Sequence, residues 1–195
     1  MTIDRPIIFS APMVRALLDS RKIMTRRMAW HERRVADPVG KLKLVGDRPT
    51  LWTRVKPGDR LWVREGWRRD VDYGTPVYRA DYPGGESPPP PDAIPLIIYK
   101  AVNDFYRWQS PIHMARSSSR LTLIVTAVKI ERLQKITHEE AEAEGIKCDM
   151  SVRGFRDHFS ELWNRLHGPG SWDANPEVFA LTFTVHQQNI DRLSA

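Results

Sequence analysis

The chain has 195 residues, which is enough for one well-buried core and makes a second complete domain unexpected. Its formal net charge of +6 favours phosphate-bearing partners or small anions, with a solvated basic surface as the plainer alternative. The single cysteine, Cys148, excludes an intrachain disulfide and a cysteine-based zinc site, and no apolar run approaches the roughly 18 residues that cross a bilayer.

The sequence also bears on the localisation of the protein and on the enzyme classes to which it could belong. The first six residues lack the basic stretch and apolar core of a secretory signal, so we expect a cytoplasmic protein with no membrane partner. The histidines show no pair at a metal-ligand spacing, and we expect neither a metal nor another cofactor. Phosphate-loop, zinc-protease and serine-esterase motifs are missing.

The chain opens on a strand followed by a helix. The apolar run at 6–9 predicts a short strand, and Ser10 behind it is a typical helix N-cap. Val14, Leu17 and Leu18 follow the i, i+3, i+4 rule, so the helix should have one buried stripe.

The segment directly behind this helix, Ser20-Arg21-Lys22-Ile23-Met24-Thr25-Arg26-Arg27, is the most informative of the chain. Residues 24–28 are expected to run extended, which places Lys22 and Thr25 at a helix-to-strand junction. Neighbouring cations lower a lysine pKa because they disfavour the ammonium form, and a neutral lysine can act as a base. The plain alternatives are a solvated lysine beyond a helix end and a threonine chosen for its β-propensity.

The middle of the chain alternates strands and turns. Residues 41–45 alternate polar and apolar, as a half-buried strand does, and 56–59 form a strong turn. The alternation resumes at 60–65, which places Leu61 and Val63 on one face of a strand and Trp62 and Arg64 on the other. The Pro/Gly-rich stretch 82–95 predicts an extended loop.

The second half of the chain combines two strands with two helices. Residues 121–133, rich in Thr, Ile and Val, predict a long strand, and Thr137 with Glu140 forms a capping box for a short acidic helix. A second helix is expected from near Ser151 to Gly168, followed by a last strand at 178–185. Many strands, few helices and no βα alternation predict an α+β fold, as a small mixed barrel rather than a doubly wound sheet.

Taken in chain order, these segments resemble the ASCH family. The resemblance runs from about residue 6 to 185, and it implies a PUA-like mixed β-barrel with a few flanking helices. It further implies a single domain at 1–187 with an insertion at about 68–110 and a tail at 188–195. The runs at 112–120 and 171–176 resemble the longer phage and prophage branch. The segments that carry the resemblance are Arg21-Lys22-x-x-Thr25-x-Arg27, Pro57-Gly58-Asp59-Arg60-Leu61-Trp62-Val63-Arg64-Glu65 and Glu140-Ala141-Glu142-Ala143-Glu144-Gly145-Ile146.

The resemblance implies an activity as well as a fold. The family includes bacterial N4-acetylcytidine amidohydrolases, which remove the acyl group from N4-acylated cytosine nucleosides with a Lys, a Thr and a Glu. Matching the motifs assigns these catalytic roles to Lys22, Thr25 and Glu144, with a small-molecule nucleoside as the substrate. The family often has Gly where this chain has Ser20, at the turn before the motif.

Amide hydrolysis suits these three side chains. Thr25 could attack as a nucleophile if a desolvated Lys22 took its proton. Glu144 could hold Lys22 in place, position a water, or protonate the departing cytosine. Its plain alternative is a place on the solvated acidic face of the short helix. An acyl-threonine intermediate and direct attack by water both remain open.

Five further side chains are expected to bind the substrate. Arg27, or backbone N–H groups at the junction, could stabilise the oxyanion. Trp67 could stack on a base, as could Trp62 and Trp108, although most tryptophans pack in cores. Glu65 could pair with Arg27 or read the cytosine amino group, with a structural salt bridge as its alternative. The predicted set is Arg27, Glu65, Arg64, Trp67 and Arg120.

Two other classes of function stay open at this point. The first is a PUA-like RNA-binding module, with or without ribonuclease activity, in which the basic residues hold phosphates. The second is a phage accessory protein that binds a host partner and has lost catalysis. The sequence indicates no particular oligomeric state.

Overall fold

A computed structural model describes residues 2–36, 39, 42–70, 74–82, 107–147 and 154–193. The chain forms two compact units. The first unit contains residues 1–19, 60–123 and 185–195, and the second contains 20–59 and 124–184. Two long strands, Thr122–Arg132 and Glu177–His186, each have residues in both units. The division therefore does not test the predicted single domain at 1–187, which stays a prediction.

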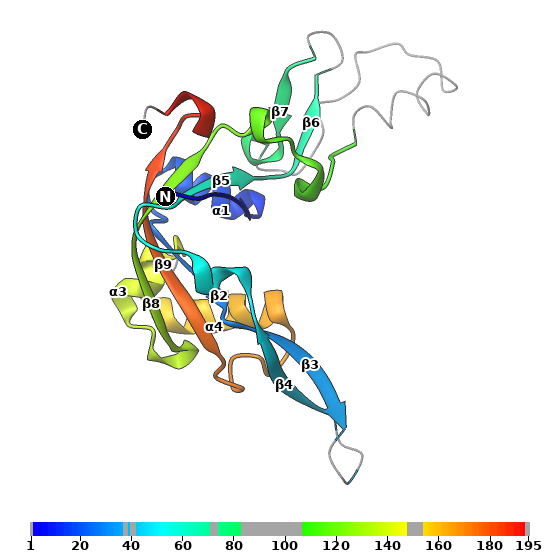
Figure 1. The fold of residues 1–195 in the computed structure, drawn as a ribbon, viewed down its shortest axis with the longest axis vertical. Helices are drawn as coiled ribbons and strands as arrows, with labels where there is room; N and C mark the ends of the chain where they lie inside the picture. The colour runs from blue at the N-terminus through cyan, green and yellow to red at the C-terminus, as the bar shows by residue number, and fades with distance from the viewer. Residues whose placement is uncertain are drawn as a thin grey trace, which may run out of the picture. The chain divides into compact units, whose positions relative to one another are not determined.

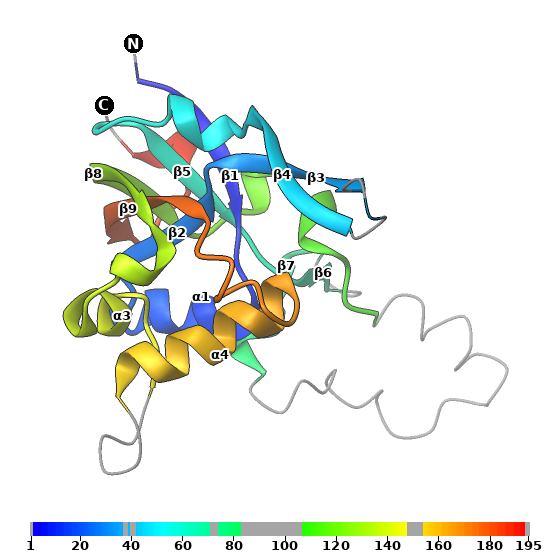
Figure 2. The same cartoon turned by 90° about the horizontal axis from the view of Figure 1, so that it is seen from below.

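The first unit is built on a parallel strand pair (Figures 1 and 2). Strand β1 (Asp4–Ile8) pairs with β5 (Arg60–Arg64), with Ile7 opposite Val63. The N–H of Val63 donates to the carbonyl of Leu121 at 3.0 Å, which extends the pairing to the chain just before β8. The remaining elements are α1 (Ala11–Leu18), β6 (Trp67–Arg69), β7 (Pro76–Tyr78), and the short 3-10 turns η2 (Arg79–Asp81), η3 (Pro111–His113), η4 (Arg116–Ser118) and η6 (Ile190–Arg192).

The predicted strand and helix at the start of the chain are confirmed. Ser10 is the N-cap of α1 with an extended backbone, and its side chain makes no capping hydrogen bond. Val14 and Leu17 are fully buried, whereas Leu18 is half-buried. The helix is therefore held chiefly by the packing of its apolar stripe.

The second unit is built on antiparallel strands. β2 pairs with β9 so that Thr25 lies opposite Leu181. Helices α3 and α4 lie on the same side of these strands (Figures 1 and 2). The elements are β2 (Met24–Met28), β3 (Trp30–Ala36), β4 (Leu42–Pro49), η1 (Leu51–Arg54), β8 (Thr122–Arg132), η5 (Leu133–Lys135), α3 (His138–Ala143), α4 (Phe155–His167) and β9 (Glu177–His186).

The core of the second unit forms where α4 meets α3 and the strands. Phe159 and Trp163 are the buried members of α4, and they join Leu133, Ile136 and Val178 in one apolar cluster. This spacing of four residues on a helix is what the sequence pattern predicted. The apolar pattern of the sequence predicts that Leu166, in the last turn of α4, is buried as well, but Leu166 is 63% exposed.

The expected α+β class is confirmed, with more strand than helix among the described residues. The capping box at Thr137, the long strand near 121–133 and the last strand are also confirmed. The helix expected from Ser151 begins at Phe155, behind an N-cap at Gly154. Most of the predicted loop 82–95 and of the insertion 68–110 lies outside the described residues, as does Cys148.

On β5, Trp62 was expected on the face opposite Leu61 and Val63. The Arg64 guanidinium carbon lies 4.5 Å from the centre of the Trp62 ring, as residues two apart on a strand allow. Trp62 is buried nonetheless, so both faces of this strand are covered. None of the described helices is long and apolar enough to cross a bilayer.

Candidate active site

The structure brings together two of the three predicted catalytic residues. Lys22 Nζ donates to Glu144 Oε2 at 2.7 Å and to the Glu144 backbone carbonyl at 2.8 Å. Both residues belong to the second unit, and they are only 2% and 4% exposed. The plain alternatives, a solvated lysine and a solvated acidic helix face, do not describe these two residues.

Local backbone structure explains how Lys22 comes to lie against Glu144. Ser20 has φ 57°, a left-handed conformation that turns the chain from α1 toward β2. Glu144 is the C-cap of α3, and Gly145 behind it has φ 82°, which ends the helix. Lys22 and Glu144 then form an antiparallel bridge, so the lysine lies at the carbonyl end of α3, where a cation is favoured.

Burial is the largest influence on the Lys22 amine. Removing the ammonium from water lowers the pKa of Lys22 below its ordinary value. Glu144 opposes this change through its charge and its hydrogen bond, while Arg27 and then Arg26 lower the pKa further. The predicted effect of neighbouring cations on the pKa is therefore present but is smaller than that of desolvation.

Arg26, which the sequence did not single out, holds the other oxygen of Glu144. Its Nη1 donates to Glu144 Oε1 at 3.3 Å, and its Nη2 donates to Glu131 Oε1 at 2.9 Å and to Glu140 Oε2. The Arg26 side chain is fully buried. One guanidinium thus binds three carboxylates, and it fixes the position of the carboxylate that contacts Lys22.

Lys129 completes this cluster from its exposed edge. Its Nζ lies 2.7 Å from Glu131 Oε2 and 3.2 Å from Glu140 Oε1, and its side chain is 55% exposed. With Lys22 and Arg26, three cations meet three carboxylates, so the cluster is balanced in charge. We call these six residues the charge cluster: Lys22, Arg26, Lys129, Glu131, Glu140 and Glu144.

Thr25 is buried on β2 but does not join the other two. Lys22 and Arg26 both reach Glu144, so alternation along an extended chain directs Thr25 to the opposite face. Within the described residues, no hydrogen bond connects Thr25 with Lys22 or Glu144. Of the three predicted catalytic residues, Lys22 and Glu144 are therefore in contact, whereas Thr25 is near Lys22 in sequence.

Arg27 is the one predicted substrate-binding residue that belongs to the same unit. Burial lowers its pKa to about 10 against the attraction of Glu144, so it stays positively charged at neutral pH. Its guanidinium carbon lies 5.5 Å from the centre of the Trp52 ring. Burial first, and the charge of Arg27 second, also hold the pKa of His167 below its ordinary value. His167 lines a cavity of about 250 Å³ in this unit.

The other four predicted substrate-binding residues belong to the first unit. Glu65 is bound by Arg120, at 2.9 Å to one oxygen and 3.1 Å to the other, and Arg120 also holds Asp81. The structural salt bridge considered for Glu65 is thus present, and its partner is Arg120 rather than Arg27. Trp67 is buried, and Arg64 stacks on Trp62.

Sequence reasoning missed Arg26 and Glu131, and two signals could have found them. Arg26 stands four residues after Lys22 in an extended segment, a spacing that puts both on one face. Glu131 is an acidic residue within a strand rich in Thr, Ile and Val, where a charge usually requires a partner. In the described ranges, no group of three His, Cys, Asp or Glu side chains is arranged to hold a metal ion.

The site therefore consists of a buried lysine with a lowered pKa, a carboxylate at hydrogen-bond distance, and an arginine, Arg26, that holds the carboxylate. Such an arrangement can move a proton within a region shielded from water. Comparison with protein-family models, with curated proteins and with solved structures found no match to this chain.

Proposed function

We propose that this protein is an ASCH amidohydrolase with a PUA-like fold that removes the acyl group from N4-acylated cytosine. The observation that carries the proposal is the buried contact of Lys22 Nζ with Glu144 Oε2 at 2.7 Å. The resemblance of the motifs supplies the substrate class, and the pair supplies a chemistry that amide hydrolysis needs. The α+β architecture is compatible with the proposed fold.

The lowered pKa of Lys22 gives it the role of proton carrier. In the neutral form, its amine accepts a proton from the attacking oxygen as the new C–O bond forms at the acyl carbon. When the C–N4 bond breaks, the departing amine receives a proton from the Lys22 ammonium. Water is consumed, and the products are the cytosine nucleoside and the carboxylic acid.

Glu144, Arg26 and Arg27 assist this proton transfer. Glu144 stabilises the ammonium that forms on Lys22, and Arg26 holds its second oxygen so that the carboxylate cannot turn away. Alternation gives Arg27 the same face of β2 as Thr25, but its positive charge still acts on Lys22 and Glu144, and it would stabilise the negative oxygen of the tetrahedral intermediate. The burial of the pair requires local opening before the acyl carbonyl can reach Nζ.

The resemblance of the motif assigns a role to Thr25, although no contact with Lys22 among the described residues supports one. Since the described residues give no hydrogen bond between them, a water molecule fits the role of attacking oxygen better than Thr25 Oγ1. Thr25 would then orient the acyl group or the water. Replacement by serine should preserve this role, and replacement by alanine should impair it.

The experiment is to incubate the purified protein with N4-acetylcytidine and to follow its conversion to cytidine by absorbance and mass. Lys22→Ala should reduce turnover by at least about a hundredfold, the usual contribution of a general base. Lys129→Ala is the matched control, because it removes a lysine from the same charge cluster at its exposed edge. Thr126→Ala, an exposed threonine of β8, is the control for Thr25→Ala.

Full activity of a folded Lys22→Ala protein would refute the assigned mechanism. Absence of turnover by the wild type on acetyl, propionyl and benzoyl derivatives would refute the activity itself. Equal losses in Lys22→Ala and Lys129→Ala would assign the effect to the stability of the charge cluster rather than to proton transfer.

A further inference from the structure

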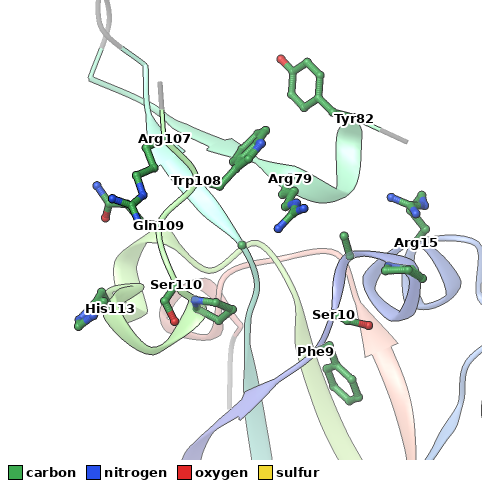
Figure 3. A pocket seen from close by; sticks show the side chains of 14 residues that line it. Phe9, Ser10, Arg15, Arg79, Tyr82, Arg107, Trp108, Gln109, Ser110 and His113 are labelled. Atoms are coloured by element: carbon green, nitrogen blue, oxygen red, sulfur yellow. The ribbon is translucent and has the colours of Figure 1, made fainter. Parts of the chain in front are cut away.

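A cavity in the first unit takes no part in the proposed reaction. It has a volume of about 870 Å³ (Figure 3). Its walls come from the turn between β1 and α1, from Gly66 behind β5, from Arg79 and Tyr82 at η2, and from residues 107–113. A cavity of this size accommodates a ligand of the size of a nucleotide.

Among the described residues, three arginines and no carboxylate line the cavity. They come from distant parts of the chain: Arg15 from α1, Arg79 from η2, and Arg107. Arg15 Nη1 donates to the carbonyl of Ala80 at 3.1 Å, which holds its guanidinium against the backbone of η2. None of the three forms an ion pair with another described residue, although surface arginines commonly do.

The nearest acidic residue in sequence is already engaged. Asp81 follows Arg79 by two positions, and both of its oxygens accept hydrogen bonds from Arg120. Asp81 is held by Arg120, which it shares with Glu65, and Asp81 does not line the cavity, so no carboxylate of the described lining pairs with the three arginines. Guanidinium groups that line one cavity attract an anion, and the planar fork of arginine matches phosphate oxygens.

Aromatic rings stand beside these cations. The ring centres of Trp108 and Tyr82 are 5.6 Å apart with their planes inclined at 51°. Both rings line the cavity and are partly exposed, and Figure 3 shows Trp108 next to Arg79. A partly exposed tryptophan ring beside guanidinium groups is the combination with which proteins stack a nucleobase and hold its phosphate.

The N-cap residue of α1 adds one hydroxyl to the lining. Ser10 lines the cavity, and its hydroxyl is not used as a helix cap. Gly66 also lines it, and a Cβ at that position would lie 3.2 Å from Cβ of Arg79. The absence of a side chain at Gly66 thus leaves room for Arg79 to keep its place.

We propose that this cavity binds a nucleoside phosphate, with the phosphate on Arg15, Arg79 and Arg107 and the base against Trp108. The shared chemistry can come from a free nucleotide or from one residue of a single nucleic-acid strand. The proposal is independent of the amidohydrolase activity, because all of its residues belong to the first unit and none has a proposed catalytic role.

The test is a binding titration with two probes, AMP by calorimetry and a fluorescein-labelled oligouridylate by anisotropy. Arg79→Ala and the double variant Arg15→Ala/Arg79→Ala should weaken binding by about tenfold or more. The slope of log affinity against log salt should also fall by about one for each phosphate contact removed. Trp108→Ala should weaken binding by about tenfold, while Trp108→Phe should retain most of it.

Arg192→Ala is the control, because it removes an exposed arginine of the same unit that does not line the cavity. Its affinity should equal that of the wild type. Arg79→Lys, which keeps the charge, guards against a folding defect and should bind more tightly than Arg79→Ala. Turnover of N4-acetylcytidine by the same variants reports separately on the proposed reaction.

Binding of AMP and of the oligonucleotide at similar affinity would identify a free nucleotide as the ligand, and binding of the oligonucleotide alone would identify a single strand. Binding of neither probe by the wild type would overturn the proposal. Equal affinities in the wild type, the double arginine variant and Trp108→Ala would overturn it as well, since binding would then occur elsewhere.

Discussion

Lys22 and Glu144 meet twice, since one ammonium group binds both the side-chain carboxylate and the backbone carbonyl of the same glutamate. The first contact neutralises a buried charge, and the second satisfies a carbonyl that the end of α3 leaves without an intrahelical partner. Structure and proposed chemistry therefore depend on the same nitrogen atom. Experiments on this pair must separate loss of stability from loss of catalysis.

Lys22→Met should lower the free energy of unfolding by about 3–5 kcal/mol, because it leaves the carboxylate of Glu144 buried with one partner fewer. Chemical denaturation measures this change. The double variant Lys22→Met/Glu144→Leu removes both charges and should recover most of the stability, while turnover stays lost. Recovery of turnover in the double variant would show that the pair is structural only.

The rate of deacylation should rise with pH. The neutral amine of Lys22 is the proposed base, and its pKa is lowered chiefly by burial, so kcat/KM should climb through a midpoint below 10.5, the ordinary pKa of lysine. Arg27→Met removes a cation that lowers this pKa, and the midpoint should move to higher pH. Arg132→Met, at an exposed position, should leave the midpoint in place. A profile without a rising limb would contradict the assignment of Lys22.

Arg26 should be among the most sensitive positions of the second unit. Arg26→Met removes the guanidinium shared by Glu131, Glu140 and Glu144, and unfolding free energy should fall by at least about 3–5 kcal/mol. Arg26→Lys restores the charge without the fork and should recover only part of the loss. A wild-type melting profile in Arg26→Met would show that the three carboxylates are neutral or rearranged.

Acid should weaken the first unit through Asp4. The hydrogen bond from Arg60 and contacts with Arg116 hold the pKa of Asp4 below 3.8, against the opposing effect of burial. A lowered folded pKa means that the stabilisation is present above pH 3.8 and is lost as the pH falls through the folded value. Asp4→Asn should be less stable than the wild type at neutral pH, by under about 1 kcal/mol for a partly exposed pair. The two proteins should converge in strong acid, as measured by thermal unfolding across pH.

The N-caps of α1 and α3 offer a matched comparison. Thr137 accepts a hydrogen bond from the N–H of Glu140 at 3.2 Å, whereas the side chain of Ser10 makes no capping bond. Thr137→Ala should cost about 1 kcal/mol of unfolding free energy. Ser10→Ala should change it by less than about 0.5 kcal/mol. Equal costs would mean that intrinsic N-cap preference, rather than the hydrogen bond, decides stability here.

Local signals in the sequence predicted the elements well, because each depends on a few neighbouring residues. The apolar stripe of α1, the capping box at Thr137 and the long strand β8 are of this kind. The end of α4 was less accurate because a periodic pattern does not reveal which turns meet a neighbour. Leu166 fits the pattern and is mostly exposed.

The site was predicted in part, and only through the resemblance of ordered motifs. No local rule connects Lys22 with Glu144 or reveals that both are buried, because burial of a charge depends on partners far away in sequence. Arg26 was missed for the same reason. The opposite orientation of Thr25 follows from strand alternation, which became informative only once Lys22 and Arg26 were seen on the same carboxylate.

The bond between Lys22 and Glu144 joins residues 122 positions apart. Closing so long a loop is entropically costly and slow compared with forming α3 or α4 from local contacts. During synthesis, Lys22 leaves the ribosome long before its partner exists, and it stays hydrated until Glu144 arrives. The altered acidity of this lysine is thus a property of the completed chain, and its appearance during refolding should trail helix formation.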